Sequence, residues 1–318
     1  MADPRSPSQS TPPGHAGADR STGPGPGTLS ARVVPWAARV AWVLVAVVGG
    51  SALEAAVDGR STAVRWTVAV GGWGVFAAIA VALSIPSVRS LTVARLGTPL
   101  APVAAVVAAV AGAPGVDVAL LAAPATIAVI AAFSAEFGRC MVQASAYGDE
   151  DRLPLRSPVP VGTAAVASWV IWAAAVVAAP LLLAAKNWIG GVPLAALAVA
   201  ATVLLGPRWH KMSRRWLVLV PAGIVVHDPV VLADTLMVRT DQLLGIGLAR
   251  TDTQAADLTG PASGYAVQID TSETVSTVFA FTPQEPNGRA IHMTGFLVAP
   301  SRPGEALRLA AARRIPIR

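Results

Sequence analysis

The first two thirds of the chain consist of long apolar runs separated by short polar segments. About 20 consecutive apolar residues form a helix long enough to cross roughly 30 Å of hydrocarbon. The third run, residues 99–112, is shorter than this. It is interpreted as a short span, with a re-entrant arm as the alternative. The pattern predicts a transmembrane domain over residues 32–207, with about six spans at residues 36–53, 64–85, 99–112, 116–135, 161–185 and 188–205.

From residue 216 onward, apolar and polar side chains alternate, which is typical of strands with one buried face. A Pro-Ala-Gly tripeptide at 221–223 suits the tight turn of a first hairpin. Residues 303–314 fit a closing helix, because an acid lies in the first turn and two arginines lie in the last. The strand-forming runs are residues 216–220, 224–227, 236–239, 243–249, 265–269, 275–281 and 292–298.

Seven short strands and a closing helix, directly after a basic segment, resemble the C-terminal pleckstrin-homology-like (PH-like) domains of bacterial, actinobacterial-type multi-span membrane proteins. Residues 214–228 and 296–304 carry this resemblance. It implies that residues 216–318 form an all-β, partly open barrel of two sheets closed by one α-helix, with binding as its activity. The turn at 221–223 lacks the Lys and Arg that lipid-binding PH domains usually place there. Phosphoinositide-type recognition is therefore not indicated.

Residues 1–31 have a different composition from the rest of the chain. They are rich in Pro, Gly, Ser and Thr and contain almost no large apolar side chain. Such a segment buries too little surface to offset the entropy of ordering it. We predict a disordered N-terminal tail.

The overall composition supports membrane insertion. Hydrophobic residues make up 54% of the chain and charged residues 13%, and the mean hydropathy is +0.58. Soluble domains have about 25% charged residues. The net charge of +6 does not indicate a nucleic-acid-binding domain, because residues 216–318 contain eight Arg against nine Asp and Glu.

The basic residues between the spans predict the orientation of the chain, since Lys and Arg are retained on the cytoplasmic side. One side receives three of them, Arg60, Arg65 and Lys186. The opposite side, where both termini lie, carries many more of these residues. Both termini are therefore expected in the cytoplasm of a bacterial cell. The other side receives eleven, namely Arg32, Arg39, Arg89, Arg95, Arg139, Arg152, Arg156, Arg208, Lys211, Arg214 and Arg215.

Residues 208–215 form a basic junction between the last span and the first strand. Each Lys or Arg near an anionic leaflet contributes about 1 kcal/mol of attraction, and tryptophan favours the interface. These residues either bind the membrane surface or serve only to set the topology. The residues expected to contact the membrane surface are Arg208, Trp209, Lys211, Arg214, Arg215 and Trp216.

Glu136 is the best candidate for a polar site within the membrane, since an ionisable side chain in a span is often functional. The alternative is a helix-end residue that faces the headgroups. The acidic residues 149–151 fit a solvated loop better than a metal site, because consecutive side chains point in different directions. His227, Asp228 and His292 lack a nucleophile in a recognisable motif. We expect no catalytic, cofactor-binding or metal-binding residues.

These features predict a non-enzymatic membrane scaffold whose C-terminal domain binds a protein partner or the inner-leaflet surface. The alternative is a small transporter or flippase component that this domain regulates. A membrane-embedded enzyme has the least support, because paired His, Asp or Glu residues are absent from the predicted spans. The sequence does not indicate the oligomeric state.

Overall fold

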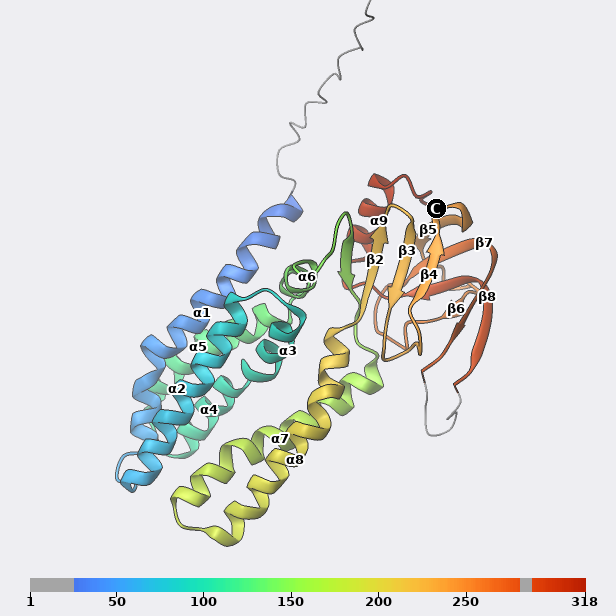
Figure 1. The fold of residues 1–318 in the computed structure, drawn as a ribbon. Coiled ribbons are helices and arrows are strands. Elements are labelled where there is room, and N and C mark those ends of the chain that lie inside the picture. Colours follow the sequence, from blue (N-terminus) through green and yellow to red (C-terminus); the bar gives the residue numbers. More distant parts are fainter. Residues whose placement is uncertain (1–25, 281–287) are drawn as a thin grey trace, which may run out of the picture.

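The structure, a computed structural model, describes residues 26–280 and 288–318. Most of the predicted tail lies outside the described residues. The first helix, α1, begins at Pro26, inside the segment 1–31 that was predicted to be disordered. A helical domain is followed by a β-rich domain, which lies at the end of the helices where α1 begins (Figure 1).

Six helices in the described part of the chain are long and apolar enough to cross a membrane. This confirms the prediction of a multi-pass membrane domain. The spans are formed by α1 (Pro26–Ala56), α2 (Thr62–Ser84), α3 with α4 (Val88–Gly97 and Leu100–Val110), α5 (Gly115–Phe133), α7 (Val159–Ala184) and α8 (Trp188–Ser213).

The third span is longer than the predicted range 99–112. It runs over Val88–Val110, so the segment before Pro99 is helical as well. Arg95 is accommodated there because its Nε donates to the Ala132 carbonyl over 3.3 Å and its guanidinium lies over the Phe133 ring. By length and composition, Val88–Val110 is therefore sufficient to cross a membrane, with a break between α3 and α4.

Helices α1, α2, α4 and α5 form a bundle, and α7 and α8 form a hairpin beside it (Figure 1). Small residues let the bundle helices approach closely: a Cβ on Gly49 of α1 would lie 2.6 Å from Leu121 Cδ1 on α5. On α2, by contrast, a Cβ on Gly71 or Gly74 would meet no atom within 4 Å. The close helix contact in the bundle is thus the one between α1 and α5.

The strands form two separate four-stranded sheets, and the described strands do not close into a barrel. The orders are β1-β2-β3-β4 and β5-β7-β8-β6, with α9 (Pro303–Ala312) after the last strand. The strands are β1 (Asp151–Pro154), β2 (Trp216–Val220), β3 (Gly223–His227), β4 (Leu236–Arg239), β5 (Leu243–Leu248), β6 (Ala256–Asp257), β7 (Val267–Val278) and β8 (Ala290–Val298).

Most strands match the sequence pattern, and the first hairpin turn is as predicted. Gly223 has φ of +150°, and a Cβ there would lie 2.0 Å from the Val238 carbonyl oxygen, so this position requires glycine. The predicted runs at 265–269 and 275–281 belong to one irregular strand, β7, up to Val278. Strands β1 and β6 were not predicted.

The segment between α5 and α7 is ordered and joins the two domains. It contains the amphipathic helix α6 (Ala135–Gln143) and strand β1, which pairs antiparallel with β2. One face of β2 packs into the core between the sheets and α9, while the other packs against α6. The β-rich domain is therefore discontinuous in sequence and includes residues from before α7.

Candidate functional site at the junction of helices and sheets

The predicted basic junction is not a linker, because α8 continues through it to Ser213. Of the six residues expected at the membrane surface, the structure exposes three: Arg208, Lys211 and Arg214. The other three are buried and contact the protein. The predicted boundary between the two domains at residue 207 thus falls inside a helix.

Both tryptophans of the junction pack inside the protein. The Trp209 ring meets Trp172 edge to face at 5.5 Å, and its Nε1 donates to Ser168 Oγ over 3.3 Å. It therefore joins α8 to α7. The Trp216 ring stacks on His227 at 4.8 Å and lies beneath the Arg152 guanidinium.

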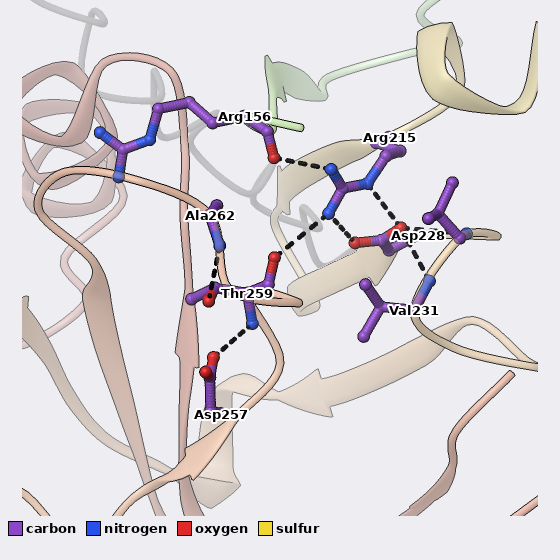
Figure 2. Close-up of polar contacts among 8 residues, drawn as sticks. Arg156, Arg215, Asp228, Val231, Asp257, Thr259 and Ala262 are labelled. Carbon is purple, nitrogen blue, oxygen red and sulfur yellow. Dashed lines mark hydrogen bonds and ion pairs between the residues drawn. The ribbon is translucent and has the colours of Figure 1, made fainter. Parts of the chain in front are cut away.

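Arg215 is buried in the β-rich domain and cannot contact a membrane surface, so this part of the prediction is wrong. Its side chain and that of Asp228 are each 1% exposed. Nε and Nη2 donate to the two carboxylate oxygens of Asp228 over 2.7 and 2.6 Å. Figure 2 shows the guanidinium reaching two further acceptors, the Arg156 and Thr259 carbonyls, at 2.6 and 3.5 Å.

This ion pair connects three segments that are distant in sequence. Asp228 also accepts from the backbone N–H groups of Val230 and Val231, so it holds the turn that follows β3 (Figure 2). The Arg156 carbonyl belongs to the loop before α7, and the Thr259 carbonyl follows β6. A bidentate, buried pair with additional acceptors gives a defined geometry and is strongly destabilised when one partner is lost.

No protein-family model, curated protein or solved structure matches this chain. The function is therefore inferred from the residues at the junction.

Glu136 lies in the first turn of α6, beyond the end of α5 at Phe133, and thus outside the spans. It forms an ion pair with Arg302, directly before α9. One turn further along α6, Arg139 pairs with Glu305 of α9. The structure places Glu136 at a contact between the two domains, and not at an intramembrane site. We call these two pairs the α6–α9 ion pairs.

The acidic residues at 149–151 form ion pairs, and the Asp149 side chain is 79% exposed, as predicted for a solvated loop. Arg313 donates to Asp149 and Asp151 over 2.9 and 3.0 Å, and Arg152 donates to Glu150 over 2.7 Å. Arg313 follows α9, so these contacts fasten the C-terminal end of α9 to the start of β1. The α9 helix is held by ion pairs at both ends.

Electrostatics favour the charged form of Glu305 in this contact. Burial raises the pKa of Glu305, but hydrogen bonds and charges from Arg139 and Arg308 outweigh burial and hold the pKa below its usual value. The carboxylate therefore stays ionised near neutral pH, as the contact between α6 and α9 requires.

The two histidines of the β-rich domain lie in different sheets. His227 Nδ1 is 3.0 Å from Thr235 Oγ1, and His292 Nδ1 is 2.7 Å from Ser276 Oγ. Burial and the charge of Arg214 lower the pKa of His227, and Asp228 acts in the opposite direction. Within the described residues, no three His, Cys, Asp or Glu side chains are grouped to hold a metal ion.

Replacing Glu136 with Gln should weaken the contact between α6 and α9 by about 1 kcal/mol, because the Arg302 side chain is 41% exposed and solvent screens the pair. Hydrogen exchange of the α9 backbone amides in the full-length protein should become faster. High salt should reduce the difference in exchange rate between the variant and the wild-type protein. The matched control is Arg250→Gln, which removes one charge from the exposed Arg250–Asp252 pair.

Exchanging the two charges should restore the contact. The double variant Glu136→Arg, Arg302→Glu keeps one acid and one base at the same positions. If its α9 exchange is as fast as that of Glu136→Gln, the ion pair does not hold the two helices together.

Proposed function

We propose that this chain is a non-enzymatic scaffold of the bacterial cytoplasmic membrane, with both termini in the cytoplasm. Its C-terminal domain is PH-like and binds a protein partner or the inner-leaflet surface. The observation that carries this proposal is the construction of the junction. Strand β1 and helix α6, both from the segment between α5 and α7, are built into the contact with the β-rich domain.

Such a junction favours a fixed platform over a domain on a flexible tether. Trp216 and Val218 on the outer face of β2 pack with Phe137 and Met141 of α6. The α6–α9 ion pairs and the contacts of Arg313 add polar links around this apolar contact. A platform of this kind presents a partner-binding surface at a constant position relative to the bilayer.

Strand β4 offers a surface for an extended segment of a partner. It is the last strand of its sheet, so one of its edges lacks a partner strand among the described residues. A cleft of about 380 Å³ separates it from β7, and the half-exposed Met237 lines this cleft. Unpaired strand edges bind extended peptides by adding a strand to the sheet.

Photo-cross-linking tests the scaffold proposal. A photo-reactive amino acid replaces Met237 in the full-length protein, and the cells are irradiated before membranes are isolated. We expect a discrete adduct with one protein. The control position is Arg60, which is exposed in the loop between α1 and α2 at the opposite end of the bundle. Equal labelling at both positions, or no discrete adduct at Met237, would contradict the binding of a protein partner at β4.

A transporter or flippase component is the second candidate, and a groove in the bundle favours it. This groove of about 660 Å³ lies between α1 and α2. Apolar residues such as Trp73 and Phe76 line it together with Glu54 and Arg65. An acid and a base beside an apolar wall suit a zwitterionic lipid.

Lipid movement in proteoliposomes tests this second candidate. The wild-type protein should move a fluorescent phosphatidylethanolamine between leaflets, and Glu54→Gln and Arg65→Gln should each slow this movement. Arg250→Gln is the control, because it removes one charge from an exposed pair of the β-rich domain. Equal rates with and without the wild-type protein would exclude the flippase proposal.

A further inference from the structure

Residues 315–318 lie along the edge of β5, the end strand of the second sheet. The Ile246 N–H donates to the Pro316 carbonyl over 2.9 Å, and the Arg318 N–H donates to the Ile246 carbonyl over 3.0 Å. Ile246 and Ile317 are paired in parallel orientation. An extended segment therefore occupies this edge in the way that a bound peptide adds a strand to a sheet.

Three glycines make room for the Arg318 side chain on the face of this sheet that points away from the core. A Cβ on Gly245 would lie 3.0 Å from Arg318 Nε, and a Cβ on Gly247 would lie 2.8 Å from the Arg318 carbonyl oxygen. A Cβ on Gly295 would lie 2.8 Å from Asp270 Oδ1. Gly245, Asp270 and Gly295 are neighbours across β5, β7 and β8, so they share one face. We call the space bordered by these three glycines and Asp270 the arginine notch.

Glycine within a strand is unfavourable, and it often marks a place where a ligand or another backbone approaches closely. The charge of Asp270 determines what the arginine notch accepts. Arg318 Nη1 donates to Asp270 Oδ2 over 2.7 Å, and the Asp270 side chain is 17% exposed. Gln268 Nε2 donates to Asp270 Oδ1 over 2.8 Å and so fixes the direction of the carboxylate. A largely buried carboxylate needs a counterion, so the notch favours a basic side chain over a neutral one.

Few contacts hold the segment that occupies this edge. Pro316, Ile317 and Arg318 are all exposed, and the Arg318 side chain is 52% exposed. Ile315 is buried and belongs to the core between the sheets. The preceding residue, Arg314, has φ of +60°, a left-handed conformation that non-glycine residues rarely adopt. The three exposed residues can therefore leave the edge while Ile315 stays in the core.

We propose that the edge of β5 and the arginine notch bind an extended segment of a partner protein, with an arginine at the position of Arg318. Residues 316–318 occupy the site within the chain, and the partner segment displaces them. Backbone hydrogen bonds to Ile246 supply affinity, and Asp270 supplies specificity for the basic side chain. The site lies on the side of the β-rich domain away from the α7–α8 hairpin, where a water-soluble partner can reach it (Figure 1).

This inference rests on the proposed scaffold function only in its choice of a protein partner. It concerns the sheet that contains β5, whereas the β4 edge belongs to the other sheet. The experiment below uses neither β4 nor Met237. It can therefore fail while the cross-linking experiment succeeds, and the reverse.

Peptide binding to the purified full-length protein in detergent tests the site. The probe is a fluorescein-labelled peptide with the sequence of residues 313–318, Arg-Arg-Ile-Pro-Ile-Arg, and binding is followed by fluorescence anisotropy. A shortened variant that lacks residues 316–318 leaves the edge of β5 free and should bind the peptide. The wild-type protein should bind it about 10- to 100-fold more weakly, because two backbone hydrogen bonds and a half-exposed ion pair hold its own segment in place.

A second variant repeats the comparison in a chain of unchanged length. Arg318→Glu places a negative charge beside Asp270 and loosens the segment, so this variant should bind the peptide more tightly than the wild-type protein does. A gel-filtration profile equal to that of the wild-type protein verifies folding. A peptide with glutamate in place of its last arginine should bind the shortened variant at least about tenfold more weakly than the original peptide does.

A further substitution and a matched control locate the binding site. In the shortened variant, Asp270→Asn should weaken peptide binding about tenfold, the usual effect of losing one charge-assisted hydrogen bond. Glu273→Gln removes one acid from an exposed position on the same strand, so it should change the affinity less than about twofold. Equal losses in these two variants, or equal affinity of the wild-type and shortened proteins, would place the peptide elsewhere and overturn the proposal.

Two other results would also overturn the proposal. If the shortened variant and Arg318→Glu both fail to bind the peptide, the edge of β5 is not a peptide site. If the wild-type protein does not bind at peptide concentrations about a hundredfold above the dissociation constant of the shortened variant, residues 316–318 form a permanent strand that a partner does not displace.

Discussion

Replacing Arg215 with Met should destabilise the β-rich domain by about 3–5 kcal/mol, because it leaves the Asp228 carboxylate buried without a counterion. Removing the guanidinium also leaves the Arg156 carbonyl without its 2.6 Å donor. A loss of this size approaches the whole stability of many domains. In full-length protein in detergent, the melting temperature of the domain, followed by limited proteolysis during heating, should fall by more than about 10 °C.

Two further variants identify the cause of this loss. Adding Asp228→Asn to Arg215→Met should recover part of the stability, because Asn is neutral and still accepts from the N–H groups of Val230 and Val231. Arg250→Met removes an arginine from a pair that is 82% and 69% exposed, and it should change stability by less than about 0.5 kcal/mol. A melting temperature for Arg215→Met equal to that of Arg250→Met would show that the buried pair contributes nothing.

The isolated fragment 216–318 should not fold to a stable monomer, although it contains most strands of the β-rich domain. It lacks Arg215, strand β1 and helix α6. Leu153 and Leu155 belong to the core between the sheets, and losing a buried leucine destabilises a protein by about 2–5 kcal/mol. Without α6, the outer face of β2 would expose Trp216 and Val218. We expect aggregation and poorly dispersed amide resonances.

Supplying the missing segment should restore folding. In mild detergent, a fusion that joins residues 135–158 through a flexible linker to residues 214–318 should melt cooperatively. The same fusion with Leu153→Asp and Leu155→Asp is the control, because it keeps the length but places charges in the core. If fragment 216–318 alone melts as cooperatively as the fusion, the discontinuous domain is not a folding requirement.

The junction shows which residues the sequence pattern can predict to be exposed and which it cannot. Arg208, Lys211 and Arg214 are exposed, as a basic segment beside a span predicts. Arg215 belongs to the same run of charges, yet it points into the domain because strand β2 begins at the next residue. Its partner Asp228 lies 13 positions away and was considered only together with His227 and His292 as a possible catalytic group. Neither residue has a local signal that distinguishes a buried ion pair from two surface charges.

The loop between α5 and α7 illustrates the same limit. Its charges suggested solvent, because Asp149, Glu150 and Asp151 are adjacent. In the structure these carboxylates neutralise Arg152 and Arg313, the latter more than 160 positions later in the chain. Glu136 likewise finds its counterion on the far side of the domain contact. Charge patterns along a chain identify ionisable groups but not their distant partners.

The sequence by itself determined the membrane domain and most strand positions, because both depend on local periodicity. An apolar run of sufficient length inserts into lipid whatever its neighbours are, and alternation marks a strand with one buried face. The tertiary structure decided which strands share a sheet, which face of β2 meets α6, and where Arg215 and Glu136 find their counterions. These contacts join segments far apart in the chain, and their free energy depends on burial and geometry that exist only once the chain has folded.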